Sequence, residues 1–381
     1  MSYKRLFSRS VGAAPGRLHF AAHSHHLWPD ASFEGQQAAW DGAARLADHK
    51  WDRVMGEVWP EAQGHIAAEL KLPTSDTIVF APNTHELLVR ILSAMGKDRP
   101  RVLASDGEFH SFRRQSARWA EAGAIELETV AAESSGFADA LMARAKSGDF
   151  DLIFVSHVMF GMGRVFDRIA ELAALARPEG PWVVIDGYHA FMAIEVDLSA
   201  VADRIFYLAG GYKYAMAGEG ACFLHAPPGY GARPVNTGWF AAFDGLTLMP
   251  GQVGYAQDAR RFAGATFDPS GLYRFNAVQA MLKREGLTTA RVNSHVDPLL
   301  MSLAAELDET GLGSARLLNP AIMQPRARFL ALESPRARAW QEAFAGAGVV
   351  TDLRGDVLRI GVGLYHDEDD ITDLCDIAAS F

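Results

Sequence analysis

The sequence predicts an α/β protein with a mostly parallel central sheet between helices and a smaller C-terminal α/β domain. Segments typical of strands, at 77–80, 101–106, 125–130 and 152–158, alternate with segments of helical periodicity. The interiors of these strands are mainly apolar, as in strands that are buried on both faces. Such an alternation favours parallel strands joined by crossover helices that cover both faces of the sheet.

The composition is that of a folded chain with a substantial core. Of 381 residues, 49% are hydrophobic and 22% are charged. The formal net charge is −10 and the isoelectric point is about 5.7, so nucleic acid or an anionic membrane is not expected as the main partner. No apolar run reaches the roughly 18 residues that would predict a membrane span.

Cysteine usage and the N-terminal stretch indicate a cytoplasmic protein. Cys222 and Cys375 form no CxxC pair, which excludes a disulfide framework and a cysteine-type zinc site. The basic N-terminal stretch MSYKRLFSRSVGAAPG lacks the apolar core of a signal peptide. We therefore expect a cytoplasmic location.

The N-terminal part is expected to be an arm followed by helices. Residues 1–20 show little periodicity, and two helices are predicted over 33–71. Between the arm and the first helix, His23 and His25 would share one face of an extended segment, and His26 would lie on the other face. Three histidines suggest a metal, but no carboxylate or cysteine accompanies them at ligand spacing, so no metal site is predicted.

The strand at 77–80 is followed by a loop and an apolar helix at 87–95. Asn83, Thr84 and His85 would lie at the N-terminus of this helix. Unpaired backbone N–H groups and the helix dipole make such an N-terminus a binding site for phosphate. An ordinary helix cap uses the same residue types, so the residues alone leave both interpretations open.

Two neighbouring strands carry the residues on which the functional prediction depends. The apolar run at 183–185 ends in Asp186, and the run at 205–208 leads to Lys213 after two glycines. Ligands of open α/β sheets bind outside the carboxyl ends of the strands, so this carboxylate and this amine would face one crevice. Pyridoxal phosphate (PLP) requires such a pair: an amine to bind its aldehyde carbon and an acid to hold its pyridine nitrogen protonated.

The chain is expected to divide into three parts. Residues 1–60 would form an N-terminal arm and helices that pack with the small domain, 61–275 the large PLP-binding domain, and 276–381 the small C-terminal domain. A crossover helix is predicted at 164–176, and a long helix is predicted to begin at Asn276.

The stretch from 183 to 225 resembles the PLP-lysine region of the class V aminotransferase group, and of kynureninases above all. That family carries Asp-x-x-His after one strand, here Asp186 and His189. It then carries Tyr-Lys-Tyr before a glycine-rich loop, here Tyr212, Lys213 and Tyr214. The resemblance extends from residue 18 to the end of the chain and implies a fold-type I PLP-dependent enzyme.

The resemblance also implies roles for residues elsewhere in the chain. It implies that Phe109 stacks on the pyridine ring, with His110 as the alternative if the register shifts by one. It implies that Arg359, inside an apolar strand, binds the α-carboxylate of an amino-acid substrate. Thr266 would reach the phosphate of a neighbouring subunit in a homodimer with composite active sites. The other implied residues are Asn83, Thr84, His85, His189 and Tyr212 for the cofactor, and His25, His26 and Trp239 for the substrate.

The sequence departs from the kynureninase pattern in two places. The segment 23–26, His-Ser-His-His, replaces a substrate-proximal turn, and Met159 or Phe160 replaces a residue that is usually polar. The leading prediction is kynureninase-like hydrolysis of the Cβ–Cγ bond of a kynurenine-type amino acid. Its catalytic residues would be Lys213, Asp186 and Tyr212. The departures keep an aminotransferase or another PLP lyase of the same group as the alternative.

Other classes of protein are disfavoured. Cysteine desulfurase needs a nucleophilic cysteine on a mobile loop, whereas Cys222 lies in a predicted strand and Cys375 in a predicted helix. A non-catalytic PLP-fold regulator would be expected to lack Lys213, Asp186 or Arg359. No GxGxxG motif follows any strand, which argues against a Rossmann dehydrogenase.

Overall fold

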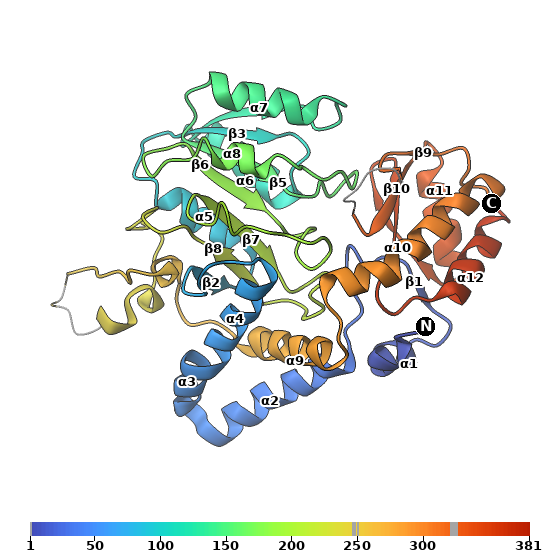
Figure 1. Cartoon of the computed structure of the whole chain (residues 1–381), viewed down its shortest axis with the longest axis horizontal. Coiled ribbons are helices and arrows are strands. Elements are labelled where there is room, and N and C mark those ends of the chain that lie inside the picture. Colours follow the sequence, from blue (N-terminus) through green and yellow to red (C-terminus); the bar gives the residue numbers. More distant parts are fainter. Residues whose placement is uncertain (1, 246–248, 250, 321–326) are drawn as a thin grey trace.

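The chain forms a large lobe and a small lobe that lie side by side (Figure 1). The computed structural model describes every residue except 1, 246–248, 250 and 321–326. A seven-stranded sheet organises the large lobe and a four-stranded sheet organises the small one. Both ends of the chain lie at the small lobe (Figure 1).

The strands of the large sheet follow the order β2-β8-β7-β6-β5-β3-β4. Neighbouring strands are parallel except at β8, which is antiparallel to both β2 and β7. The prediction of a mostly parallel central sheet is therefore confirmed. The strands are β2 (Ile78–Ala81), β3 (Arg101–Ser105), β4 (Glu126–Val130), β5 (Leu152–Ser156), β6 (Trp182–Asp186), β7 (Ile205–Gly210) and β8 (Cys222–His225).

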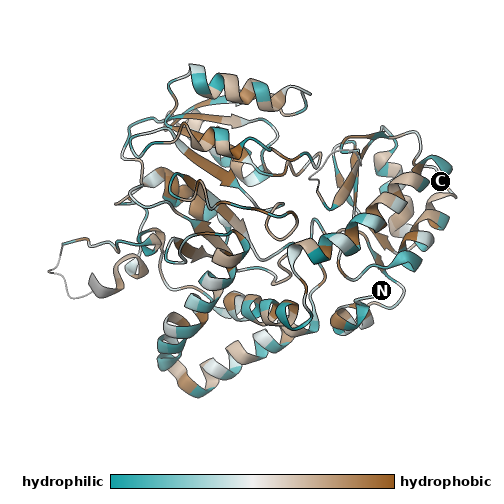
Figure 2. Cartoon of the chain, viewed as in Figure 1, coloured by the Kyte–Doolittle hydropathy of each residue, from teal (hydrophilic) through white to brown (hydrophobic). Residues whose placement is uncertain are grey.

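The central strands are buried because their side chains are apolar on both faces. Every residue of β5 and β7 is buried, and β6 is buried up to Asp186, its last residue. Figure 2 shows the hydrophobic colouring concentrated in these strands, with polar residues toward the outside of the helices. The helices of this lobe are α5 (Thr84–Ser93), α6 (His110–Glu121), α7 (Phe137–Ser147) and α8 (Ile169–Ala173).

The small lobe is an antiparallel sheet of order β12-β13-β10-β9 with helices packed against it. The N-terminal arm joins this lobe, because β1 (Leu18–His19) pairs with β11 (Val349–Val350) and Lys4 forms an ion pair with Asp367. The elements are β9 (Arg316–Leu317), β10 (Phe329–Glu333), β12 (Asp352–Arg354), β13 (Val357–Gly361), α10 (Thr289–Glu306), α11 (Ala337–Gly346) and α12 (Glu368–Ala378).

Helices α2 (Asp30–Leu46) and α9 (Ser270–Arg284) pack side by side below the large sheet in the view of Figure 1. Gly35 permits the close approach, since a Cβ there would lie 2.6 Å from the Tyr273 carbonyl oxygen. The helix predicted to begin at Asn276 begins at Ser270, whose N–H donates to the Asp268 side chain.

Two other helix predictions differ from the structure. The two helices predicted over 33–71 are α2 and α4 (Trp59–Glu69), separated by the short α3 (Lys50–Arg53) and a π-helical turn at 54–58. The crossover helix predicted at 164–176 shrinks to α8, because Val158 and Val165 form a β-bridge that holds the first part as a loop. A bridge of this kind depends on tertiary structure, which the helical periodicity of a sequence cannot predict.

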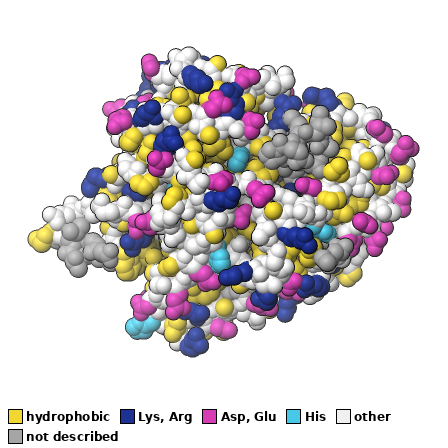
Figure 3. Space-filling view, viewed as in Figure 1, with side chains coloured by type: hydrophobic (Ala, Val, Ile, Leu, Met, Phe, Trp, Pro, Cys, Tyr) yellow, Lys and Arg dark blue, Asp and Glu magenta, His cyan; other side chains and the backbone are white. Residues whose placement is uncertain are grey.

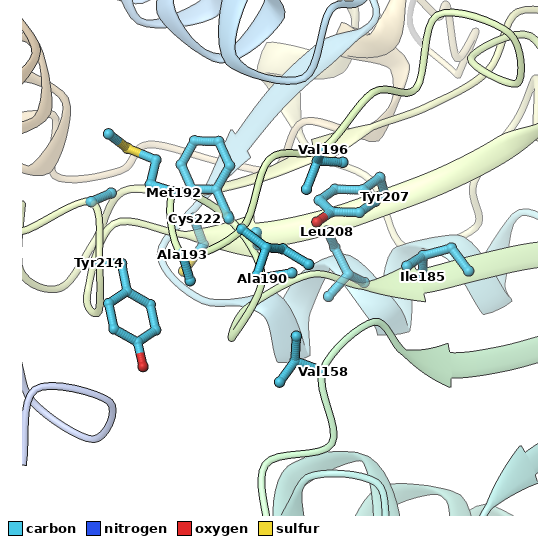
Figure 4. Close-up of a cluster of buried hydrophobic side chains, with 14 of the residues drawn as sticks. Val158, Ile185, Ala190, Met192, Ala193, Val196, Tyr207, Leu208, Tyr214 and Cys222 are labelled. Carbon is cyan, nitrogen blue, oxygen red and sulfur yellow. The ribbon is translucent and has the colours of Figure 1, made fainter. Parts of the chain in front are cut away.

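Apolar side chains from β6, β7, β8 and the loop that follows β6 form part of the core beneath the ends of these strands (Figure 4). On the face shown in Figure 3, basic and acidic side chains are intermingled. No helix of the described residues is both long and apolar enough to cross a membrane.

Candidate active site

The chain order of β6 and β7 brings Asp186 and Lys213 to the same edge of the large sheet. The two strands are parallel neighbours, with Asp186 in register with Leu208. Lys213 lies in the turn that follows Gly210, the last residue of β7. Gly210 permits a close approach of side chains, since a Cβ there would lie 2.5 Å from Cys222 Sγ and 2.7 Å from the Tyr188 hydroxyl.

A cavity of about 440 Å³, which we call the lysine cavity, lies at these strand ends, where the two lobes meet. Of the residues that the sequence assigned to the site, those that line it are Asn83, Thr84, His85, Phe109, Asp186, His189, Tyr212, Lys213 and Arg359. The sequence did not assign the other lining residues, which are Ser24, Ser111, Ser156, Val158, Phe160, Tyr188 and Arg354.

The amine of Lys213 is buried among aromatic and imidazole rings. Its Nζ donates a hydrogen bond to His189 Nε2 and lies 5.4 Å from the centre of the Tyr188 ring. Burial, reinforced by the charge of Arg359, lowers the pKa of Lys213 to about 7. Burial therefore favours the neutral, nucleophilic form of this amine at a lower pH than in an exposed lysine.

Asp186 lies at the bottom of the lysine cavity as a carboxylate with one anchored oxygen. The Tyr188 N–H donates to its Oδ1 at 2.9 Å, which fixes the orientation of the side chain. Burial raises the pKa of Asp186 to about 6, with the Tyr188 N–H and the positive charge of Lys213 opposing the shift. A buried carboxylate gains stability from a cationic partner, such as a protonated pyridine nitrogen.

The N-terminus of α5 opens onto the same cavity. Asn83 is the helix cap, because its side-chain Oδ1 accepts a hydrogen bond of 2.9 Å from the Glu86 N–H. Thr84 and His85 begin the helix and line the cavity. The cap and the phosphate site are therefore compatible: Asn83 organises the turn, and the positive end of the helix dipole faces the cavity.

Aromatic residues form another wall. Phe109 lines the lysine cavity, and its ring centre lies 5.8 Å from Lys213 Nζ. His110, the alternative stacking residue, lines an adjacent cavity instead. Phe109 and Phe160 contact each other edge to face, with ring centres 5.3 Å apart. Met159 is buried and does not line the cavity, so Phe160 is the apolar residue that faces a ligand.

Arg359 reaches the cavity from the small lobe and is 2% exposed. It lies directly across the β12–β13 hairpin from Asp352, whose carboxylate accepts a hydrogen bond from Arg359 Nη2. Its Nη1 donates to the Phe160 carbonyl at 2.6 Å, which links the two lobes. Its Nε is buried and has no acceptor, so at least this donor of the guanidinium is available to a ligand.

Histidines 25 and 26, both assigned to substrate, lie in different surroundings. His25 Nδ1 is 3.0 Å from the Tyr212 hydroxyl and so supports a residue of the cavity wall without lining the cavity. His26 is buried, contacts the rings of Phe7 and Tyr365, and bonds the Leu27 carbonyl. The structure therefore corrects the assignment of His26, which is a core residue because the chain turns its ring toward the N-terminal arm.

Trp239 and Thr266 lie outside the lysine cavity of their own chain. Trp239 Nε1 donates a hydrogen bond of 3.2 Å to Thr266 Oγ1, and both residues are exposed. Trp239 does not line the lysine cavity of its own chain, and its assignment to the substrate stays a prediction. The expectation for Thr266 concerned a neighbouring subunit, and the single chain does not test it.

Glu108 is a buried acidic residue that sequence reasoning passed over. Its carboxylate accepts hydrogen bonds from the hydroxyls of Ser105 and Ser156 and lies behind the cavity wall that Ser156 forms. Burial raises the pKa of Glu108 to about 7. It precedes Phe109 in the loop after β3, and an acidic residue in a loop is usually solvated, so nothing in the sequence indicated its burial.

The groups gathered in the lysine cavity fit PLP. A buried amine, a buried carboxylate and a helix N-terminus face one space, and the Nδ1 atoms of His85 and His189 are buried without a hydrogen-bond partner. Buried polar atoms without partners are uncommon in native proteins, and a bound ligand can supply the hydrogen bonds that such atoms lack. No group of three potential metal-binding side chains occurs within the part of the chain that the structure describes.

Comparisons with known proteins agree with this geometry. The model of the aminotransferase class-V family matches residues 34–339. Isopenicillin N epimerase from Streptomyces clavuligerus is 25% identical over 335 residues, which is 78% of each chain. A complex of the cystine C–S lyase C-DES with cysteine persulfide superimposes with a TM-score of 0.82 at 18% identity, over 98% of this chain and 100% of that chain. A cysteine desulfurase from Thermococcus onnurineus NA1 gives 0.80 at 17% identity, over 100% and 99%.

The fold and the cavity together define an α/β enzyme of fold-type I that depends on PLP. A C-DES variant whose cofactor carries a covalently linked glycine also shares the fold, with a TM-score of 0.81 at 17% identity over 98% of each chain. The chain belongs to the aminotransferase class-V family, and PLP is its cofactor.

Proposed function

We propose that Lys213 holds PLP covalently and removes the Cα proton of a bound amino acid. The observation that carries this proposal is the meeting of Lys213, Asp186 and Arg359 in one cavity. Among the described residues, no other lysine lines that cavity. When bound, PLP supplies an electron sink for the electron pair left at Cα. A lysine with a pKa of about 7 is matched to accepting a proton near neutral pH.

The other site residues hold the cofactor and orient the amino acid. Asp186 would keep the ring nitrogen protonated, and the N-terminus of α5 with Tyr212 would bind the phosphate. Arg359 would bind the α-carboxylate through its Nε and through Nη2, which also donates a hydrogen bond to Asp352. Phe109 would cover one face of the ring.

For the reaction itself, we propose kynureninase-like hydrolysis of the Cβ–Cγ bond of a β-acyl amino acid. The sequence Asp186-x-x-His189 and the sequence Tyr212-Lys213-Tyr214 support this choice. The edge-to-face pair of Phe109 and Phe160 would offer an apolar wall to an aryl ketone. Water would add its hydroxyl group to Cγ, and Tyr212, hydrogen-bonded to His25, would donate a proton to Cβ as the Cβ–Cγ bond breaks.

Incubation of the PLP-loaded protein with L-kynurenine tests the reaction. We expect anthranilate and alanine in equal amounts, measured by fluorescence and by amino-acid analysis. Unchanged kynurenine, together with exchange of the Cα hydrogen of other amino acids in D₂O, would reject the hydrolysis and leave the role of Lys213 standing. Absence of both signals would reject the role of Lys213 as well.

The second candidate is another class V reaction at Cα, namely transamination, β-elimination or epimerisation. The relative from Streptomyces is named an epimerase and the solved neighbour a C–S lyase, which favours this class. A desulfurase that uses a cysteine nucleophile is disfavoured, because Cys222 is buried and burial raises its pKa to about 12. Cys375 lies on α12 of the small lobe.

We further propose that two copies of the chain form a homodimer. The segment that carries Trp239 projects from the large lobe (Figure 1), and its described residues expose several large apolar side chains. Val235 is 82% exposed, Met249 70% and Val253 53%. Exposed apolar side chains on a projecting segment support an interface there, and Thr266, hydrogen-bonded to Trp239, would then reach the site of the partner subunit. A monomer mass by light scattering at micromolar concentration would contradict the dimer.

A further inference from the structure

A second cavity, of about 400 Å³, adjoins the lysine cavity. Phe160 and Arg354 line both cavities and mark their junction. The second cavity is rich in arginine, and we call it the arginine annex. Its arginines are Arg113, Arg164, Arg316 and Arg354.

The β12–β13 hairpin places Arg354 beside the carboxylate-binding Arg359. Asp352 and Arg354 lie two residues apart on β12 and so share a face, and Asp352 stands across from Arg359. One oxygen of Asp352 pairs with Arg354 Nη1 at 2.9 Å, and the other pairs with Arg359. One carboxylate therefore serves two guanidinium groups. Asp352, Arg354 and Arg359 together carry one net positive charge, which the α-carboxylate of one amino acid would neutralise.

Two of the four arginines of the annex, Arg113 and Arg164, form no ion pair with a carboxylate among the described residues. Arg113 has no side-chain partner among the described residues, and Arg164 donates only to the backbone carbonyls of Glu133 and Ser134. The wall also holds three acidic residues, of which Asp106 and Glu133 form no ion pair with either arginine within the described part of the chain. Arg316 is paired with Glu333.

Arginines of both cavities carry hydrogen-bond donors without acceptors. The Nε atoms of Arg164, Arg354 and Arg359 are buried and have no acceptor. A guanidinium has five N–H donors and no acceptor, so an orphaned Nε calls for an anionic or carbonyl ligand. Three such donors around two joined cavities are more than one α-carboxylate would occupy.

We propose that the arginine annex binds an anionic group at the far end of the substrate side chain. The substrate would then be an amino acid with a second acidic group, held at one end by Arg359 and at the other by Arg354 and Arg113. This inference rests on the proposed binding of an amino acid at Lys213. It applies to C–C hydrolysis and to the second candidate alike, because it concerns the end of the side chain and not the bond that breaks.

Two ligands of equal length isolate the distal charge. L-α-Aminoadipate and L-norleucine carry the same number of side-chain carbons, but only the former ends in a carboxylate. We expect the PLP-loaded protein to bind L-α-aminoadipate at least about tenfold more tightly, as expected for one charge-assisted hydrogen bond. Dissociation constants come from the change in cofactor absorbance, and their ratio cancels contributions of the shared α-amino and α-carboxylate groups.

Substitutions of the annex locate the preference. Arg113→Met, at an exposed position, should reduce the ratio severalfold, and Arg354→Met should reduce it further toward one. Arg118→Met, on the same helix and paired with Glu121 outside both cavities, should leave the ratio at the wild-type value. Raised salt should also lower the ratio in the wild type, because screening weakens an exposed charge pair.

Each outcome separates the annex from the active-site proposal. Binding of both ligands with equal affinity, or a ratio that survives Arg113→Met and Arg354→Met, overturns the annex and leaves the lysine site intact. A cofactor absorbance that responds to neither ligand overturns the binding of amino acids at Lys213, and the annex with it. Equal losses in the Arg118→Met control would mean that general surface charge, rather than the annex, attracts the acid.

Discussion

Replacement of Lys213 by alanine is expected to abolish turnover and the covalent retention of PLP. The substitution removes both the amine that binds the aldehyde and the base that accepts the Cα proton. We expect turnover to fall by at least ~10³-fold, since a positioned general base alone contributes about 10²–10⁴-fold. The variant should also release its cofactor on dialysis, which absorbance spectra of the dialysed protein would measure.

The control is Lys71→Ala, which removes an exposed lysine that pairs with Asp197 far from the cavity. It should keep both turnover and cofactor. A Lys213→Ala protein with a normal melting temperature that still retains PLP on dialysis would contradict the assignment. Loss of cofactor in both variants would point to a folding effect instead.

The lowered pKa of Lys213 adds a pH dependence to this prediction. Uptake of PLP by the cofactor-free protein requires a neutral amine, and the pKa of Lys213 is about 7 because burial disfavours its charge. Below that pH the uptake rate should rise about tenfold per pH unit, and above it the rate should level off. A rate that keeps rising to about pH 10, the usual pKa of lysine, would mean that the amine is not buried.

The second large effect is expected for Asp186→Asn. The substitution keeps the shape of the side chain and its hydrogen bond from the Tyr188 N–H, but removes the negative charge that would hold the ring nitrogen protonated. We expect turnover to fall by about 10²–10⁴-fold, because the electron sink depends on that proton. The affinity for PLP should fall by roughly one charge-assisted hydrogen bond, about 1.5–3 kcal/mol.

Steady-state kinetics at saturating PLP separates the two effects. Asp197→Asn, at an exposed position that bonds Ser199 and Lys71, is the matched control and should keep wild-type turnover. Unchanged turnover in Asp186→Asn at full cofactor occupancy would remove Asp186 from the mechanism. A variant that loses PLP but regains full turnover at high PLP would restrict Asp186 to cofactor binding.

The sequence predicted those parts of the structure that depend on local pattern. Continuous apolar runs predicted the central parallel strands, and Asp186, at the end of one strand, and Lys213, in the turn after the next, were predicted as site residues. Both residues line the lysine cavity because parallel neighbours end at the same edge of a sheet. The helix cap at Asn83 could also be predicted, because asparagine is a common cap and this one directly precedes an apolar helix.

The remaining parts depend on contacts between distant segments. The sequence did not assign Arg354 to the site, because only the pairing of β12 with β13 places it beside Arg359. The sequence gives no sign that Glu108 is buried, because its partners Ser105 and Ser156 lie on two different strands that meet only in the fold. His26 was assigned to the substrate together with His25, but the N-terminal arm packs against its ring.

Borohydride reduction of the PLP-loaded protein tests the central claim most directly. Reduction fixes the cofactor to the nitrogen that holds it, and peptide mapping by mass spectrometry then identifies the residue. We predict one phosphopyridoxyl group for each chain, on the peptide that contains Lys213, and none in Lys213→Ala. A label on another lysine, or no label in a protein that binds PLP, would contradict the claim that Lys213 is the residue around which this active site is built.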